Sequence, residues 1–144
     1  MNKKGFTLVE LLAVIALLGV IATIAVASVN GITDSINKNM LEKKLLMIEE
    51  AAVLMGEDNK NNIVYSGYNY DGNPCQIYYV YDLVPDYLDK DNDNDCLNLG
   101  SSEGCVVNPI NKDDYLDNKE IIVYFKNKRI YAKVNMDNDL TCSN

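Results

Sequence analysis

The chain has 144 residues, of which 13 are basic and 21 acidic, so its formal net charge is −8. This length suits one domain with an extended element. The absence of histidine removes the commonest general base and the commonest metal ligand. An acidic surface is also repelled by nucleic-acid phosphates. We therefore expect no enzymatic activity, no cofactor and no direct nucleic-acid partner.

The N-terminal segment is basic first and apolar afterwards. Lys3 and Lys4 precede a run from Leu11 to Ile32 that contains no charged residue. Because about 20 apolar residues span a bilayer as a helix, this run is long enough for a membrane anchor. The positive-inside rule then predicts a cytoplasmic N-terminus and an exported acidic domain.

Three interpretations fit this segment: a plain signal anchor, a secretory signal peptide cut after Ala27, or a class III leader cut before the apolar run, which is then kept. Glu10 discriminates among them, since a charge near the start of a membrane helix is costly and the first two have no use for it. Cleavage between Gly5 and Phe6 creates an α-amino group that can neutralise this carboxylate in an apolar bundle. The third interpretation is therefore favoured.

The run GFTLVELLAVIALLGVIA at residues 5–22 closely resembles the N-terminus of type IV pilins and of the related pseudopilins of secretion and competence systems. The resemblance implies that a prepilin peptidase cuts after Gly5 and methylates the amine of Phe6. It also implies that Glu10 pairs with the N-terminus of a neighbouring subunit, and that an assembly platform protein and an ATPase are indirect partners. The proline that many relatives carry late in this helix is absent here.

Beyond the apolar run the pattern becomes amphipathic and then β-rich. Apolar residues recur at helical spacing from Ile32 to Met55, Gly56 is expected to cap the helix, and a loop is expected at residues 57–62. Short strands are predicted at residues 63–65, 76–81 and 105–107, with a turn or one helical turn at 82–88.

The strongest strand prediction is a hairpin of residues 120–126 and 129–134. Asn127 stands in its turn, and asparagine tolerates the positive φ that tight turns need. The predicted fold is α+β, a long N-terminal helix with a membrane-spanning first half, packed against a small C-terminal antiparallel β-sheet. The predicted parts are a leader at 1–5, a transmembrane or filament-core helix at 6–32, its amphipathic continuation at 33–56 and an exported β-rich pilin domain at 57–144.

Four cysteines follow the apolar segment, and no CxxC pair occurs among them. With histidine absent as well, a structural zinc site is disfavoured. An even number of cysteines in an exported domain suggests two disulfides, for which three pairings are possible. We expect Cys96 to pair with Cys105 around an acidic loop, and Cys75 to pair with Cys142 near the C-terminus. Free buried thiols are the alternative.

The acidic tract at residues 89–95 places carboxylates at alternate positions, the oxygen ligands that calcium prefers. Asp91, Asp93 and Asp95 are weak calcium candidates. Laid from Asp89 or from Asp91, however, the EF-hand template lacks both its glycine and its bidentate glutamate. A solvated polar loop is therefore favoured over a metal site.

These features predict a structural subunit, a pilin or pseudopilin, of a type IV pilus-like filament. It is expected to be a single-pass membrane protein first and then to join other pilin subunits in a cell-surface filament through its N-terminal helix. Two alternatives stay open: a secreted acidic binding domain released by signal peptidase after Ala27, and a competence pseudopilin acting in DNA uptake. Sequence does not separate these systems from type II secretion.

Overall fold

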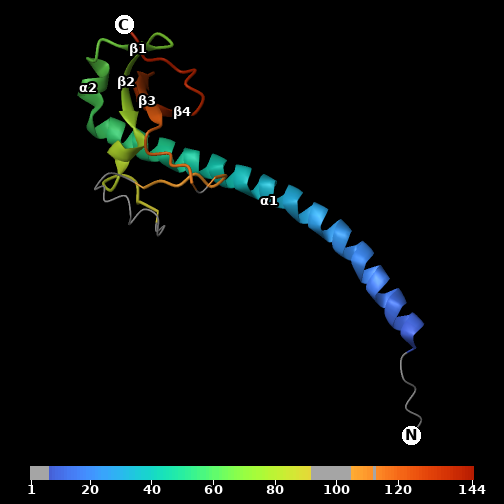
Figure 1. The fold of residues 1–144 in the computed structure, drawn as a ribbon. Helices are drawn as coiled ribbons and strands as arrows, with labels where there is room; N and C mark the ends of the chain where they lie inside the picture. The colour runs from blue at the N-terminus through green and yellow to red at the C-terminus, as the bar shows by residue number, and fades with distance from the viewer. Residues whose placement is uncertain (1–6, 92–104, 112) are drawn as a thin grey trace. The chain divides into compact units, whose positions relative to one another are not determined.

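The structure, a computed structural model, describes residues 7–91, 105–111 and 113–144, with the backbone alone for residues 24–30. Two compact units are present, Met1–Lys38 and Asn39–Asn144. The elements in chain order are α1 (Leu8–Asp58), α2 (Lys60–Val64), β1 (Asn69–Tyr70), β2 (Asn73–Tyr79), the 3₁₀ helix η1 (Val80–Leu83), β3 (Glu120–Lys126) and β4 (Arg129–Asn135) (Figure 1).

The described part of the first unit is the beginning of α1, and its apolar side chains face outward. Exposed fractions here run from 48% at Val14 to 76% at Leu8. Among the described residues, no helix contains a stretch long and apolar enough to cross a membrane. The segment expected to do so, residues 6–32, includes Phe6 and the side chains of 24–30, which lie outside the described part. The membrane span therefore stays a prediction.

The second unit contains an antiparallel four-stranded sheet in the order β1-β2-β3-β4. The predicted hairpin is confirmed: β3 and β4 pair from Glu120↔Asn135 to Lys126↔Arg129. Its two turn residues, Asn127 and Lys128, have φ angles of 50° and 66°. A two-residue turn with positive φ matches the right-handed twist of the flanking strands.

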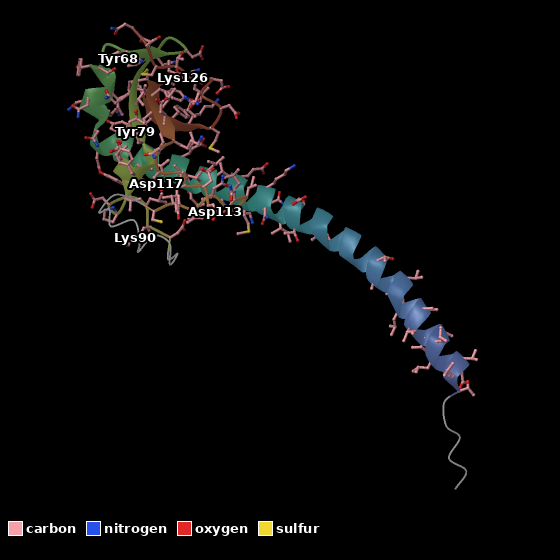
Figure 2. The ribbon with its side chains drawn as sticks, in the orientation of Figure 1. Tyr68, Tyr79, Lys90, Asp113, Asp117 and Lys126 are labelled. Carbon is pink, nitrogen blue, oxygen red and sulfur yellow. A yellow bond between two sulfur atoms is a disulfide. The ribbon has the colours of Figure 1, made fainter. Side chains whose placement is uncertain are left out.

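The core of this unit forms where α1 packs on the sheet (Figure 2). Apolar residues spaced along one helix face, among them Ile48, Ala52 and Met55, pack with Ile121 and Val123 of β3, and all five are at most 4% exposed. The long helix packed against a small antiparallel sheet is the α+β fold expected from the sequence.

Only the C-terminal part of the predicted apolar stripe of α1 is buried. Ile32, Ile36 and Met40 are 50–60% exposed rather than buried. A second group of apolar residues on α1, Leu46, Met47 and Leu54, is also exposed. Helical spacing indicates which residues share a face, but only the position of the sheet decides which face is buried.

Gly56 was expected to cap the helix, and this was wrong. Helix α1 continues to Asp58, and Gly56 is buried against the sheet. A Cβ added here would lie 2.7 Å from a methyl group of Ile130 and 2.7 Å from one of Val123. The glycine therefore permits the close approach of helix and sheet, a role that glycine's missing side chain serves well.

Residues 57–65 also depart from the prediction of a loop and a strand. Asn59 donates its side-chain amide to the carbonyl of Met55 at 2.9 Å, and α2 begins immediately afterwards. Ile63 is fully buried in the core. The strand propensity of β-branched residues is context-dependent, and burial of Ile63 from a helical turn overrides it.

Strand β2 begins three residues before the predicted 76–81 and ends at Tyr79. The carboxylate of Asp82 accepts a hydrogen bond from the Tyr79 backbone N–H at 2.8 Å, which starts η1 and ends the strand. The strand predicted at 105–107 is an isolated bridge between Val107 and Tyr115. Its amides are used elsewhere, since Val106 N–H donates to the carboxylate of Asp117 at 3.2 Å.

Candidate functional site

Thr7 and Glu10 are joined by hydrogen bonds at the first turn of α1. The backbone N–H and the hydroxyl of Thr7 donate to Glu10 Oε2 at 2.9 and 2.8 Å. In return the Glu10 N–H donates to Thr7 Oγ1 at 3.4 Å. This reciprocal pattern is a capping box, which satisfies backbone donors that the start of a helix leaves without partners.

The capping box was missed at the level of sequence, although its signal is present. The motif requires threonine or serine followed three residues later by glutamate or glutamine, and Thr7-x-x-Glu10 meets it. Both bonds from Thr7 reach the same carboxylate oxygen of Glu10. The acid therefore begins the helix and keeps acceptor capacity for a further cation. The predicted processing residues, Gly5 and Phe6, lie outside the described residues.

Residues 1–26 match the family model of the prokaryotic N-terminal methylation motif. The chain carries the N-terminal motif of type IV pilins and pseudopilins. No curated protein and no solved structure matches the chain. The motif supports a structural pilin-type subunit, and membership of that family would imply processing by a prepilin peptidase, assembly with other pilin subunits, and membrane anchoring followed by export.

In the second unit the C-terminus is fastened to the sheet. Cys75 in β2 and Cys142 form a disulfide with their Cα atoms 6.1 Å apart, the pairing expected from the sequence. Next to it, Asn69 and Ser143 exchange backbone hydrogen bonds of 2.8 and 3.1 Å. The last residues are thus held along the outer strand β1.

The second predicted disulfide involves one residue that the structure describes and one that it does not. Cys105 is disulfide-bonded and almost completely buried. Cys96 lies outside the described residues, so its pairing with Cys105 stays a prediction. The alternative of four free thiols is wrong for Cys75, Cys142 and Cys105.

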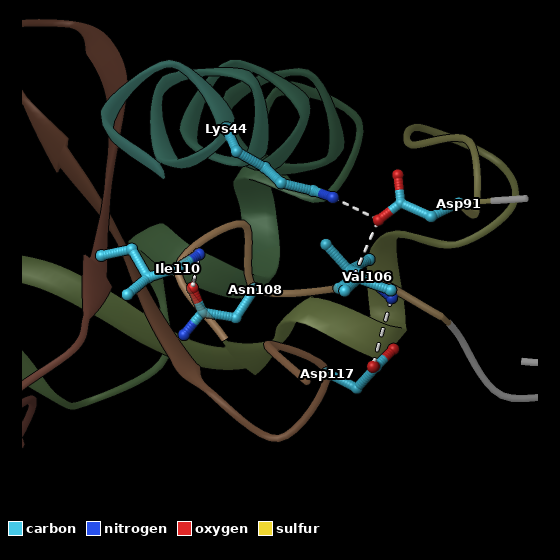
Figure 3. Close-up of polar contacts among 7 residues, drawn as sticks. Lys44, Asp91, Val106, Asn108, Ile110 and Asp117 are labelled. Atoms are coloured by element: carbon cyan, nitrogen blue, oxygen red, sulfur yellow. Dashed lines mark hydrogen bonds and ion pairs between the residues drawn. The ribbon is translucent and has the colours of Figure 1, made fainter. Parts of the chain in front are cut away.

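Asp91 joins α1 to the segment that follows Cys105 (Figure 3). Its carboxylate is ion-paired with Lys44 of α1 and accepts the Val107 N–H at 2.8 Å. Its own N–H donates to the carbonyl of Cys105 at 2.8 Å. Asp91 thus holds buried irregular backbone in place, because amides outside a sheet ladder still need acceptors.

The remaining calcium candidates, Asp93 and Asp95, lie outside the described residues. Within the described ranges, no group of three or more acidic or cysteine side chains is arranged to hold a metal ion. Of the three candidates, only Asp91 lies among the described residues. Its carboxylate contacts Lys44 and the backbone N–H of Val107.

Asp117 is the second carboxylate of this region (Figure 3). One oxygen accepts the Val106 N–H, and the other is buried with no hydrogen-bond partner among the described residues. Burial raises the pKa of this carboxyl above its ordinary value, and the charge of Asp91 adds to the effect. An ionised form without full solvation is costly, which is the cause of the shift.

Proposed function

We propose that this chain is a pilin or pseudopilin that is held in the membrane by residues 6–32 and then assembled into a type IV pilus-like filament. The match of residues 1–26 to the methylation motif carries the proposal. The outward-facing apolar side chains of the first part of α1 support it, since a surface of this kind is normally covered by lipid or protein.

The same apolar helix suits both the membrane and the filament, because in the filament the helices of neighbouring subunits replace lipid with little change in burial. The driving work would come from an ATPase acting through a platform protein, as in the family. Removal of residues 1–5 exposes the amine of Phe6, which the peptidase then methylates. In the filament this amine faces Glu10 of a neighbour, whose carboxylate the capping box already positions near the helix start.

N-terminal sequencing and mass spectrometry of the mature chain test the proposal. A chain that begins with N-methylated phenylalanine at position 6 is the expected result. A mature chain beginning at Ser28 would instead show signal-peptide cleavage after Ala27 and a released acidic domain, and it would overturn the proposal.

A role as a competence pseudopilin in DNA uptake shares all these N-terminal features. It differs in the machine that the filament serves, not in the chemistry of this chain. Loss of transformation with intact protein secretion in a strain lacking this chain would select it over a secretion pseudopilin.

A further inference from the structure

The β3–β4 hairpin concentrates positive charge in an acidic chain. Residues 126–133 contain Lys126, Lys128, Arg129 and Lys133 and no acidic residue. The remaining residues comprise nine basic against 21 acidic side chains, a net charge of −12. A local concentration of this kind favours contact with a negatively charged surface.

The two cations at the tip of the hairpin are free to make such a contact. Lys128 and Arg129 are exposed, and neither forms an ion pair with another described residue. Lys126, at the end of β3 (Figure 2), instead lies with its Nζ 3.9 Å from Asp71 Oδ2. Strand pairing up to Lys126↔Arg129 fixes the backbone at the turn, so the positions of Lys128 and Arg129 are well defined.

A groove lined by apolar and acidic residues lies between α1 and β4 in the same unit. Its volume is about 480 Å³. Leu46 and Leu54 are 58% and 61% exposed there. The lining residues are Leu46, Glu49, Glu50, Val53, Leu54 and Ala132.

The groove reaches the free edge of the sheet at Ala132, because β4 is the last strand of the sheet. The Val134 N–H donates to Glu49 Oε1 at 3.2 Å, so it points away from β3. Since orientation alternates along an antiparallel strand, the backbone groups of Ala132 point outward too. Glu50 is exposed and has no ion pair among the described residues. The groove therefore offers the carboxylate of Glu50 and the outward backbone groups of Ala132.

We propose that the hairpin tip of one copy of this chain docks into this groove of a second copy, with Lys128 and Arg129 facing Glu50. The inference rests on the proposed function, because a filament places many copies side by side. The aliphatic stems of the two cations would cover Leu46 and Leu54, while their charged ends pair with the carboxylate.

A second copy fits these features better than a nucleic acid does. Nucleic acid would meet four cations on a molecule whose remaining charge of −12 repels it. A second copy instead supplies a groove with apolar surface and a free carboxylate together. The tip and the groove are different patches, so the contact is heterologous, and such contacts propagate into helical filaments.

The test measures filament yield from the full chain in cells with their own assembly machinery. The variants are Lys128→Glu/Arg129→Glu, Glu50→Arg, and the three changes combined. The matched control is Lys43→Glu/Lys90→Glu, which changes the charge equally at two exposed lysines outside hairpin and groove. Membrane levels and urea unfolding midpoints of each variant show whether the chain still folds.

We expect the hairpin variant and Glu50→Arg each to lower filament yield by roughly tenfold, and their combination to recover at least roughly a third of it, as paired interface charges do. The control should stay within about twofold of the wild type, since exposed charges without partners contribute little. Equal yields for the hairpin variant and the control, or no recovery in the combination, overturn the inference.

A gel-shift experiment with double-stranded DNA separates the other class of partner. Binding by the wild type that is lost in the hairpin variant, with normal filament yield, would assign the hairpin to a polyanion and overturn the inference. Filaments of the wild type that depend on Glu10 but not on the hairpin leave the proposed function standing alone. A wild type that forms no filament removes both.

Discussion

At the scale of single residues, Glu10 and Gly56 each have a role that the surrounding residues define. Glu10 accepts two hydrogen bonds from Thr7 and so begins α1. Gly56 lies in the helix–sheet contact, where an added Cβ would come within 2.7 Å of Ile130 and Val123. The first role follows from spacing along the chain, and the second depends on elements distant in sequence.

Replacing Glu10 by alanine should leave membrane insertion intact and prevent efficient assembly, because the neighbour's amine loses its counter-ion in an apolar bundle. Membrane fractionation measures insertion, and the yield of sheared filaments measures assembly. Glu42→Ala, at an exposed acid on the same helix, serves as the control. Normal filament yield from the Glu10 variant would contradict the assigned role.

Replacing Gly56 by alanine should destabilise the second unit by about 1–3 kcal/mol, the usual cost of overpacking. The added methyl would lie 2.7 Å from side-chain atoms of Ile130 and Val123, so helix or sheet must shift. Denaturant unfolding of the full chain in detergent measures the loss. Gly31→Ala is the matched helical control, since nothing lies within 4 Å of its added methyl. Equal stability of the two variants would show that the helix–sheet contact adapts freely.

At the scale of elements, two devices hold the irregular parts of the second unit to its helix and sheet. The Cys75–Cys142 disulfide fastens the C-terminus across a sequence separation of 67 residues. Asp91, ion-paired with Lys44, holds the segment after Cys105 on α1. Irregular segments of this kind have few ladder hydrogen bonds of their own, so such contacts define their position.

Removing the disulfide with Cys75→Ser/Cys142→Ser should cost about 2–5 kcal/mol, the usual loss for a native disulfide in a small exported domain. The C-terminal residues should then separate from β1, since the pairing of Asn69 with Ser143 is an isolated bridge and not a continuous ladder. Hydrogen exchange of these two amides measures the release. Protection unchanged from the wild type would mean that the tail is held without the covalent bond.

At the scale of the whole molecule, charge acts in two ways. The net charge of −8 makes two copies of the chain repel each other in general, and the proposed contact of the basic hairpin would act against this repulsion. Inside the second unit, Asp117 makes stability depend on pH. Because its folded-state pKa lies above the ordinary value of 3.8, the folded chain binds a proton more tightly than the unfolded one. Stability is therefore lost as pH rises above 3.8 and through the folded-state pKa.

Asp117→Asn should accordingly be more stable than the wild type at neutral pH, and it should lack this part of the pH dependence, since an amide keeps the acceptor for Val106 without a charge. Urea unfolding between about pH 4 and pH 7 measures the difference. Asp113→Asn, at an exposed aspartate nearby in sequence, is the control (Figure 2). A variant no more stable than the wild type at neutral pH would show that the buried oxygen is solvated.

The sequence by itself determined the N-terminal motif, the long helix and the β3–β4 hairpin, whereas the structure selected Cys75–Cys142 among the pairings that four cysteines allow. These three features are local signals, carried by neighbouring residues, by apolar periodicity and by a two-residue turn. The capping box of Thr7 and Glu10 belongs to the same class and was readable in the same way.

Only the tertiary structure decided where α1 ends, which of its faces is buried, and how residues 57–65 and 105–107 fold. The sequence suggests a helix cap at Gly56 and a strand at Ile63. In the structure, Gly56 instead packs against the sheet, and Ile63 is buried in the core from a helical turn. Val106 and Val107 give their amides to Asp117 and Asp91, which are distant in the chain. Such roles depend on contacts between distant segments, and local propensity is too weak to predict them.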